Sequence, residues 1–172
     1  MANWAYVEAK VLLPTKNIDK FFKYFGYCYT EGKNIDTKMY LARTNLLSGS
    51  EEEEMSDDKK FISVRFTCEV AWSIESSWIS GYPAEEDNFN CVTINQILKE
   101  CEVVKFRARS EEPGVGFEEL LTYEIGGDVI MESRDYWYTD FSTDFEEAYE
   151  MLKEYRKSKP TRKPKESVKT DA

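Results

Sequence analysis

Strict alternation of apolar and polar residues in residues 61–70 constrains the fold of this chain more than any other feature. The apolar positions are Ile62, Val64, Phe66, Cys68 and Val70, and the polar positions between them are Ser63, Arg65, Thr67 and Glu69. Successive side chains of a β-strand point to opposite faces of its sheet. The segment therefore predicts a strand with one face packed on a hydrophobic core.

Other segments predict further strands. Residues 5–13 alternate in the same way, and we expect strands at residues 39–43, 102–109, 117–125 and 128–138 as well. The last two are expected to pair as a hairpin, because Gly126-Gly127 is a typical two-residue turn between strands.

Three segments carry apolar residues at helical spacing. The first follows Asn17, a candidate helix cap, and the second follows Thr93. The third begins at about residue 144, where Thr143 and Glu146 have the spacing of a capping box. We therefore expect two short amphipathic helices within the chain and one near its C-terminal end.

The order of these elements is β-α-β-β-α-β, followed by a hairpin and a helix. Two helices on one face of a mainly antiparallel sheet predict an α+β fold, a ferredoxin-like β-α-β-β-α-β sandwich with an added C-terminal β-hairpin and helix. We expect a single domain in residues 1–157, with an acidic mobile loop at about residues 48–60 that contains four consecutive glutamates. Residues 158–172 are basic and lack an apolar period, which predicts a disordered tail.

The chain has no histidine among its 172 residues, which excludes catalysis by Ser-His-Asp and Cys-His groups. Its four cysteines form no CxxC pair, so we expect reduced, mostly buried thiols, no metal site and no cofactor. The sequence has neither a signal-like start nor an apolar run of roughly 18 residues. A cytoplasmic protein without a membrane role is therefore expected.

Charge is distributed unevenly along the chain. The net charge is −10, although residues 153–172 contain eight basic and three acidic residues. The remaining acidic body repels nucleic acid and favours basic partners. We therefore expect a protein partner, basic or nucleic-acid-binding in character, with direct contact to nucleic acid limited to the tail.

The loop between two predicted strands, around residues 110–117, contains Pro113, Gly114 and Gly116 and ends at Phe117. Glycine and proline permit or fix backbone shapes that other residues resist, so the loop is a tight turn or a rigid binding platform. It does not match a phosphate-binding loop, because it lacks a third glycine and a following helix. Four neighbouring carboxylates would also repel phosphate: Glu111, Glu112, Glu118 and Glu119.

Aromatic residues are candidates for a binding surface beside this loop. Trp72 and Trp78 combine apolar area with a polar edge, which suits contact with a partner. Packing in the core is the common alternative for large aromatic residues. In Tyr136-Trp137-Tyr138, alternation along a strand exposes at least one ring, which suits a protein interface.

Glu111 and Glu112 are weak candidates for catalytic carboxylates. Paired carboxylates perform acid-base chemistry when they share an apolar cleft. Adjacent strand residues point to opposite faces, however, and so do not share a site. Turn residues that are solvated or bonded to the backbone are the favoured interpretation.

Four motifs carry a family resemblance. They are Asn3-Trp4, Ala71-Trp72-Ser73, Trp78 and the run EEPGVGF that begins at Glu111. In these motifs the chain resembles the YubB-type ferredoxin-like domain family over roughly residues 3–132, with Ala5 where members commonly carry cysteine. The resemblance implies a ferredoxin-like fold and a setting on phages, plasmids or bacterial genomes. It implies no catalytic residue, since the molecular function of the family is not established.

We therefore expect a non-enzymatic binding or regulatory protein of a bacterial mobile element, a phage or plasmid. Its binding face would combine the loop at residues 113–117 with the tryptophans. An alternative is an acidic mimic of nucleic acid that inhibits a host nucleic-acid-binding or defence protein. A second alternative is a small carboxylate-dependent enzyme.

Overall fold

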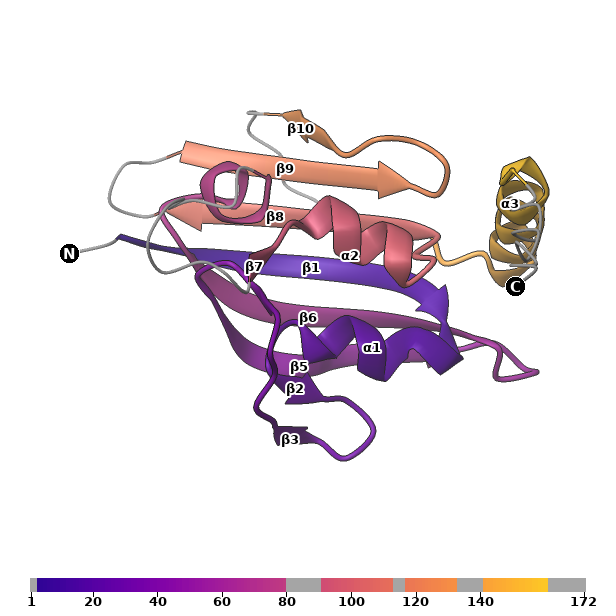
Figure 1. The fold of residues 1–172 in the computed structure, drawn as a ribbon, viewed down its shortest axis with the longest axis horizontal. Helices are drawn as coiled ribbons and strands as arrows, with labels where there is room; N and C mark the ends of the chain where they lie inside the picture. The colour runs from indigo at the N-terminus through magenta and orange to yellow at the C-terminus, as the bar shows by residue number, and fades with distance from the viewer. Residues whose placement is uncertain (1–2, 80–90, 113–116, 133–140, 161–172) are drawn as a thin grey trace, which may run out of the picture.

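A computed structural model describes residues 3–79, 91–112, 117–132 and 141–160, and these residues form a mixed α+β fold (Figure 1). The α+β class predicted from the sequence is therefore confirmed. The helices are α1 (Ile18–Lys23), α2 (Ile94–Glu100) and α3 (Phe145–Ser158), with a 3₁₀ turn at Thr15–Asn17 and a π-helical turn at Glu75–Ile79. The strands are β1 (Trp4–Pro14), β2 (Tyr27–Cys28), β3 (Lys33–Asn34), β4 (Tyr40–Leu41), β5 (Thr44–Met55), β6 (Phe61–Ala71), β7 (Cys91–Val92), β8 (Lys105–Glu112), β9 (Phe117–Glu124) and β10 (Ile130–Glu132).

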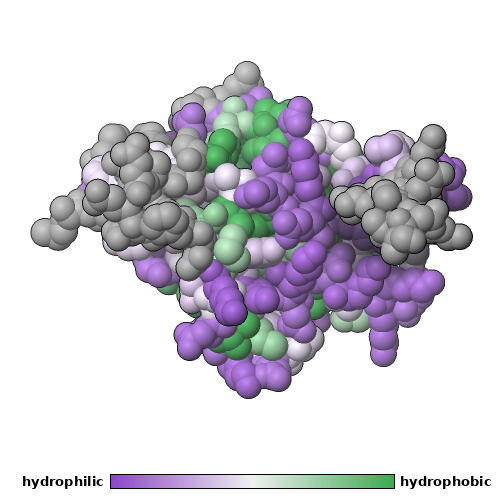
Figure 2. All heavy atoms as spheres, viewed as in Figure 1, coloured by the Kyte–Doolittle hydropathy of each residue, from purple (hydrophilic) through white to green (hydrophobic). Residues whose placement is uncertain are grey.

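The main sheet has six strands in the order β10-β9-β8-β1-β6-β5. All of its pairings are antiparallel, and β1 lies between β6 and β8. Helices α1 and α2 lie on one face of this sheet, and α3 stands at the end where β1 finishes (Figure 1). The outer surface of the α1–α2 layer is mostly hydrophilic, as expected for amphipathic helices (Figure 2).

The principal core lies between this helix layer and the sheet. The alternation predicted for residues 61–70 is present, and Val64, Phe66 and Val70 are fully buried. The ring of Phe66 lies 5.2 Å from that of Phe22 and 5.3 Å from that of Phe25, both from the segment around α1. Burial of each such side chain stabilises the fold by about 1.5–3 kcal/mol, so these contacts fix α1 against the sheet.

A second cluster on the opposite face explains the position of α3. Leu12 and Val104 pack there with Ala148 and Leu152 of α3. Since Val11 and Leu13 belong to the principal core, β1 is buried on both faces near its C-terminal end. Helix α3 thus covers one end of the face that α1 and α2 leave open.

Polar contacts also hold α3 in place. The Arg156 guanidinium donates hydrogen bonds to both carboxylate oxygens of Glu102, at 2.9 and 2.6 Å. The Tyr149 hydroxyl donates to the Asp58 carboxylate in the turn between β5 and β6. The helix is therefore tied to two segments that are distant in sequence.

The predicted mobile loop at residues 48–60 is wrong for its first part, because β5 continues through the four glutamates to Met55. Glu52 forms an ion pair with Arg65 at 3.1 Å, and the Glu53 carboxylate accepts a hydrogen bond from Tyr29. An edge strand leaves its side chains open to solvent, so it accepts a run of charges that a central strand would not. Pairing with β6 therefore overrides the weak strand propensity of these residues.

Two of the three predicted helix caps differ in the structure. Asn17 makes no cap, because its side-chain amide donates to the Cys101 carbonyl oxygen at 2.9 Å. At α3 the cap is Asp144, which accepts from the Glu147 amide at 3.0 Å, so the predicted box with Thr143 is wrong. The predicted cap at Thr93 is confirmed, and Gln96 completes a capping box there. Tertiary contacts redirect the side chains that local spacing had assigned to caps.

The hairpin of β9 and β10 is present, but its connection is longer than predicted. Thr122 pairs with Ile130, and residues 125–129 separate the two strands. The Gly127 amide donates to the Glu124 carbonyl oxygen at 3.0 Å, and Gly126 has a φ of +84°. The two glycines therefore form a turn inside a five-residue connection.

Gly49 in β5 provides a test of packing at the sheet edge. A Cβ added at this position would lie 2.4 Å from Cε1 of Tyr27, whose ring also contacts Phe22 at 6.0 Å between centroids. We expect Gly49→Ala to lower the free energy of unfolding by about 1–3 kcal/mol, measured by urea denaturation. In a Tyr27→Ala background the same substitution should cost much less, and equal costs in both backgrounds would contradict the proposed clash.

The contact between Glu102 and α3 predicts a pH dependence of stability. The hydrogen bonds from Arg156 hold the pKa of Glu102 below its ordinary value. A lowered folded-state pKa stabilises the protein above the unfolded-state pKa, and this contribution is lost as the pH falls through the folded-state value. We expect Glu102→Gln to reduce the free energy of unfolding at pH 7 by up to about 1 kcal/mol. The difference from wild type should shrink below about pH 4; a constant difference would contradict this assignment.

Candidate functional site

Three exposed aromatic side chains gather at the end of the sheet where β1 begins. Trp4 pairs with Ala71 of β6, and Tyr6 pairs with Glu111 of β8. The Trp72 amide donates to the Asn3 carbonyl oxygen at 2.7 Å, which places Trp72 beside the start of β1. This end of the sheet lies opposite α3 (Figure 1). We call Trp4, Tyr6 and Trp72 the aromatic end.

These rings are open to solvent to a similar degree. Trp4 is 44% exposed, Tyr6 43% and Trp72 45%. Exposed large aromatic residues that lie close together are typical of contact surfaces. Sequence reasoning selected Trp72 for a binding surface and left Tyr6 out, although the alternation of residues 5–13 already places Tyr6 on the face away from the core.

Trp72 also has an unusual backbone conformation, with a φ of +71°. An L-residue in this left-handed region is strained by about 1–2 kcal/mol, and a bulky residue there is uncommon. Strained residues of this kind cluster at functional sites. The strained backbone of Trp72 is therefore an indication that this end has a functional role.

Trp78 lies in the core and not on the surface. Its side chain is fully buried, and its indole N–H donates to Oγ1 of Thr44 at 2.8 Å. The ring of Trp78 meets that of Phe25 edge-on, with centroids 6.4 Å apart. This corrects the expectation that Trp78 contributes to a binding face, because its apolar area is used in packing.

The other predicted binding residues cannot be placed in the same way. Pro113, Gly114, Gly116, Tyr136, Trp137 and Tyr138 lie outside the described residues. The backbone of Phe117 begins β9, opposite Glu112, and its side chain also lies outside the description. Strand β8 ends at Glu112 and β9 begins at Phe117, at the same end of the sheet as the aromatic residues.

Glu111 and Glu112 are the last two residues of β8, so their interpretation as turn residues is wrong. The Glu111 side chain is 58% exposed and lies 4.0 Å from the Arg109 guanidinium. Glu112 is buried, on the other face of the strand. The prediction that these adjacent carboxylates do not share one site is confirmed by this alternation.

Glu119 is a buried carboxylate with a clear structural role. It accepts hydrogen bonds from the Ile74 amide at 2.7 Å, the Ser110 hydroxyl at 2.7 Å and the Glu75 amide at 3.3 Å. It thereby joins β9 to the start of the π-helical turn that follows Trp72. Sequence reasoning named Glu119 only as an acid near the loop. The available signal was its position in register with Leu121 and Tyr123, on the face that packs on the core.

The segment after Trp72 is held by further hydrogen bonds. The Ser77 hydroxyl donates to the Ala71 carbonyl oxygen at 2.7 Å, and the Ser73 hydroxyl bonds to Ser76. A π-helical turn is rare and is frequently found at functional sites. Together with Glu119, these contacts fix the backbone on the C-terminal side of Trp72.

The aromatic end is acidic. Glu69 and Glu111 lie on either side of Tyr6 in the sheet, and Glu8 follows it on the same face of β1. Partial burial, and then the Glu8 carboxylate, raise the pKa of Tyr6 above its ordinary value. The surface therefore combines aromatic rings with negative charge.

The thiols give no sign of a reactive site. None of the four cysteines is in a disulfide; Cys68 and Cys101 are buried, and Cys28 and Cys91 are half-buried. Burial raises the pKa of Cys101 to about 12 and also raises the pKa of Cys68 and Cys91. Thiolates are therefore disfavoured at these three positions. Within the described ranges, no group of three or more Cys, Asp or Glu side chains is arranged to hold a metal ion.

Comparison of the chain with models of protein families, with curated proteins and with solved structures finds no match. No helix in the described part of the chain is long and apolar enough to cross a membrane.

The role of Glu119 can be tested by a conservative substitution. Glu119→Gln retains the size of the side chain but replaces one acceptor oxygen by a donor, which cannot accept from the backbone amides. We expect it to lower the free energy of unfolding by about 1–3 kcal/mol, measured by urea denaturation. Glu111→Gln at the exposed neighbouring position is the matched control and should change stability by less than about 0.5 kcal/mol. Equal effects of the two substitutions would contradict the anchoring role of Glu119.

Proposed function

We propose that this protein is a non-enzymatic binding protein that contacts a protein partner through the aromatic end. The observation that carries the proposal is the exposed ring of Trp72 on a strained backbone that is hydrogen-bonded to Asn3, the residue before the exposed Trp4. Trp and Tyr are the residues most enriched among those that dominate binding energy at interfaces. A strained but anchored backbone holds such a ring in place before the partner arrives, which lowers the entropy cost of binding.

We further propose that the fold is ferredoxin-like. The order β1-α1-β5-β6-α2-β8, with the four strands arranged as β8-β1-β6-β5, supports this assignment. The hairpin partner β9 with β10, and the helix α3, are additions to that arrangement. The membership of the YubB-type family and the setting on a bacterial mobile element rest on the sequence motifs around Asn3-Trp4, Trp72 and Glu111.

The partner's surface is expected to be basic around an apolar centre. Carboxylates of Glu8, Glu69 and Glu111 surround Tyr6 and outnumber the neighbouring Arg109 guanidinium, so a cationic rim on the partner would be complementary. In many interfaces aromatic rings at the centre supply binding energy, and charged residues around them steer the partner during association. Binding is therefore expected to weaken as salt concentration rises.

Two other functions have less support. For a mimic of nucleic acid, the four glutamates of β5 are the strongest candidates, but the carboxylates of Glu51, Glu52 and Glu53 contact side chains of their own chain. For a carboxylate-dependent enzyme, Glu111 and Glu112 lie on opposite faces of β8. These observations favour the binding role.

The proposal is tested by separating stability from binding at Trp72. Glycine adopts a positive φ without steric strain, so Trp72→Gly should keep or raise the melting temperature. The loss of the ring should weaken partner binding by about thirtyfold, as for an interface residue worth about 2 kcal/mol. Melting would be followed by calorimetry, and partner proteins would be identified by cross-linking in cells and then measured by titration at low and physiological salt.

Ile130→Ala is the matched control, because Ile130 is 56% exposed and lies on β10 at the far edge of the sheet. If the partner binds the aromatic end, wild type and Ile130→Ala should bind it with equal affinity. Trp72→Gly and Trp4→Ala should bind it more weakly. Equal retention by all four proteins would overturn the proposal.

A further inference from the structure

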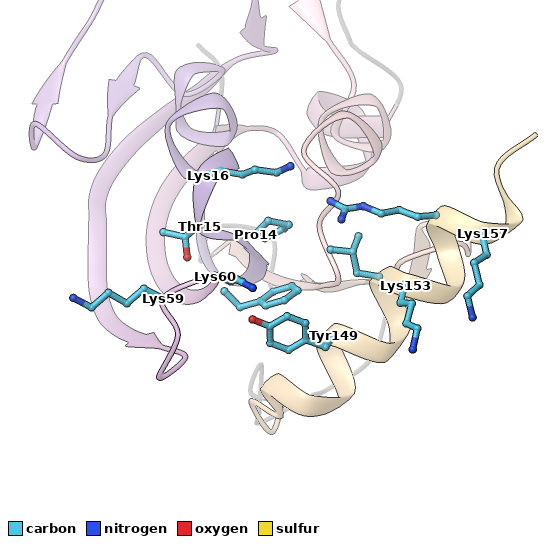
Figure 3. A pocket seen from close by; sticks show the side chains of 11 residues that line it. Pro14, Thr15, Lys16, Lys59, Lys60, Tyr149, Lys153 and Lys157 are labelled. Atoms are coloured by element: carbon cyan, nitrogen blue, oxygen red, sulfur yellow. The ribbon is translucent and has the colours of Figure 1, made fainter. Parts of the chain in front are cut away.

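A hollow of about 800 Å³ opens at the other end of the sheet, remote from the aromatic end (Figure 3). Its walls come from three segments: the 3₁₀ turn after β1, the turn between β5 and β6, and helix α3. Strand β1 separates the two ends by its 11 residues, which is about 35 Å in an extended chain. The hollow is therefore a separate surface from the aromatic end.

The charged residues around the hollow are all basic. They are Lys16, Lys59, Lys60, Lys153, Arg156 and Lys157. Lys16 points from the 3₁₀ turn toward α3, and Lys153 and Lys157 extend from α3 at the rim (Figure 3). Such a concentration of positive charge is unexpected by chance in a protein with a net charge of −10.

Part of this positive charge is not neutralised within the molecule. Among the described residues, no carboxylate lies within ion-pair distance of Lys16, Lys59 or Lys60. Arg156 is paired with Glu102, and this pair holds α3 against the rest of the hollow. Lys59 points away from α3 in Figure 3, so Lys16 and Lys60 are the groups on the opposite wall most available to an anion in the hollow.

The inner surface of the hollow is mainly apolar. Pro14, Phe61 and Leu152 are buried beneath it, and the Tyr149 ring meets the Phe61 ring edge-on at 4.6 Å between centroids. A ligand that fits must therefore present apolar groups inward and negative charge outward.

We propose that this hollow binds an acidic peptide segment of a second protein, with one or two apolar side chains resting on its floor between the 3₁₀ turn and α3. Apolar side chains of the peptide would cover the floor beside the Tyr149 ring, and its Asp or Glu side chains would reach Lys16 and Lys60. A peptide supplies both features within a few residues. A groove with an apolar floor and a charged rim is a common form of peptide recognition site.

A peptide fits these observations better than a nucleic acid. Proteins that bind single strands stack bases on open aromatic faces. Here Phe61 is only 2% exposed, and its ring is in contact with Tyr149, whose hydroxyl is bonded to Asp58. The aliphatic stems of the lysines and the side chain of Leu152 suit aliphatic groups instead.

The test uses the full chain and a short fluorescent peptide in which two leucines are flanked by aspartates and glutamates. Fluorescence anisotropy should show saturable binding that weakens about tenfold in the variant Lys16→Glu/Lys60→Glu. Replacing the leucines of the peptide by serine should weaken binding by a similar factor. An oligothymidylate of equal length is measured in parallel.

The charge-matched control is Lys33→Glu/Lys99→Glu, on β3 and α2 outside the hollow, and it should bind the peptide like wild type. Melting temperatures of both double variants confirm that they fold. If both double variants weaken peptide binding equally, the effect is due to net charge alone and the proposal is overturned. Tighter binding of the oligothymidylate than of the peptide, lost with Lys16→Glu/Lys60→Glu, would assign the hollow to nucleic acid and overturn it as well.

Discussion

The position of β1 between β6 and β8 is the constraint on which the rest of the structure depends. Val11 pairs with Val64 on one side and with Phe106 on the other, and all three are fully buried. Because β1 is central, its alternate residues divide the apolar mass between two clusters. One cluster packs α1 and α2 on the sheet, and the other packs α3 at the end where β1 finishes. Loss of this pairing would therefore disrupt the packing of α1, α2 and α3 together.

The two proposed binding surfaces follow from the two ends of this strand. At its start, β1 brings Trp4 and Tyr6 beside Trp72, and Glu119 fixes the turn behind them. At its finish, the chain enters the 3₁₀ turn that carries Lys16 toward α3. One end is aromatic and acidic, whereas the other is basic with an apolar floor. The separation of unlike charges explains how a chain of net charge −10 can present a cationic surface.

The strands with strong alternation and the helix at Thr93 were predictable because their signals are local. Side-chain period and cap spacing depend on residues only a few positions apart. The acidic segment of β5 was not predictable in this way, because its partner Arg65 lies on another strand. The Asn17 side chain was likewise not predictable, because it donates a hydrogen bond to the distant Cys101 carbonyl oxygen instead of capping the helix. In the candidate site, Trp72 was predicted from the sequence. Its positive φ was not, because no adjacent glycine or turn motif in the sequence indicates it.

An α+β fold with a hydrophobic core, the lack of histidine chemistry and the asymmetric charge could all be predicted from the sequence. These properties depend on composition and on short-range periodicity. The burial of Trp78, the exposure of Trp72 and the anchoring of a turn by Glu119 depend instead on the tertiary structure. The tertiary structure also brings lysines from three distant segments around one hollow. These outcomes depend on which strands become neighbours, and strand pairing is set by the packing of residues far apart in the chain.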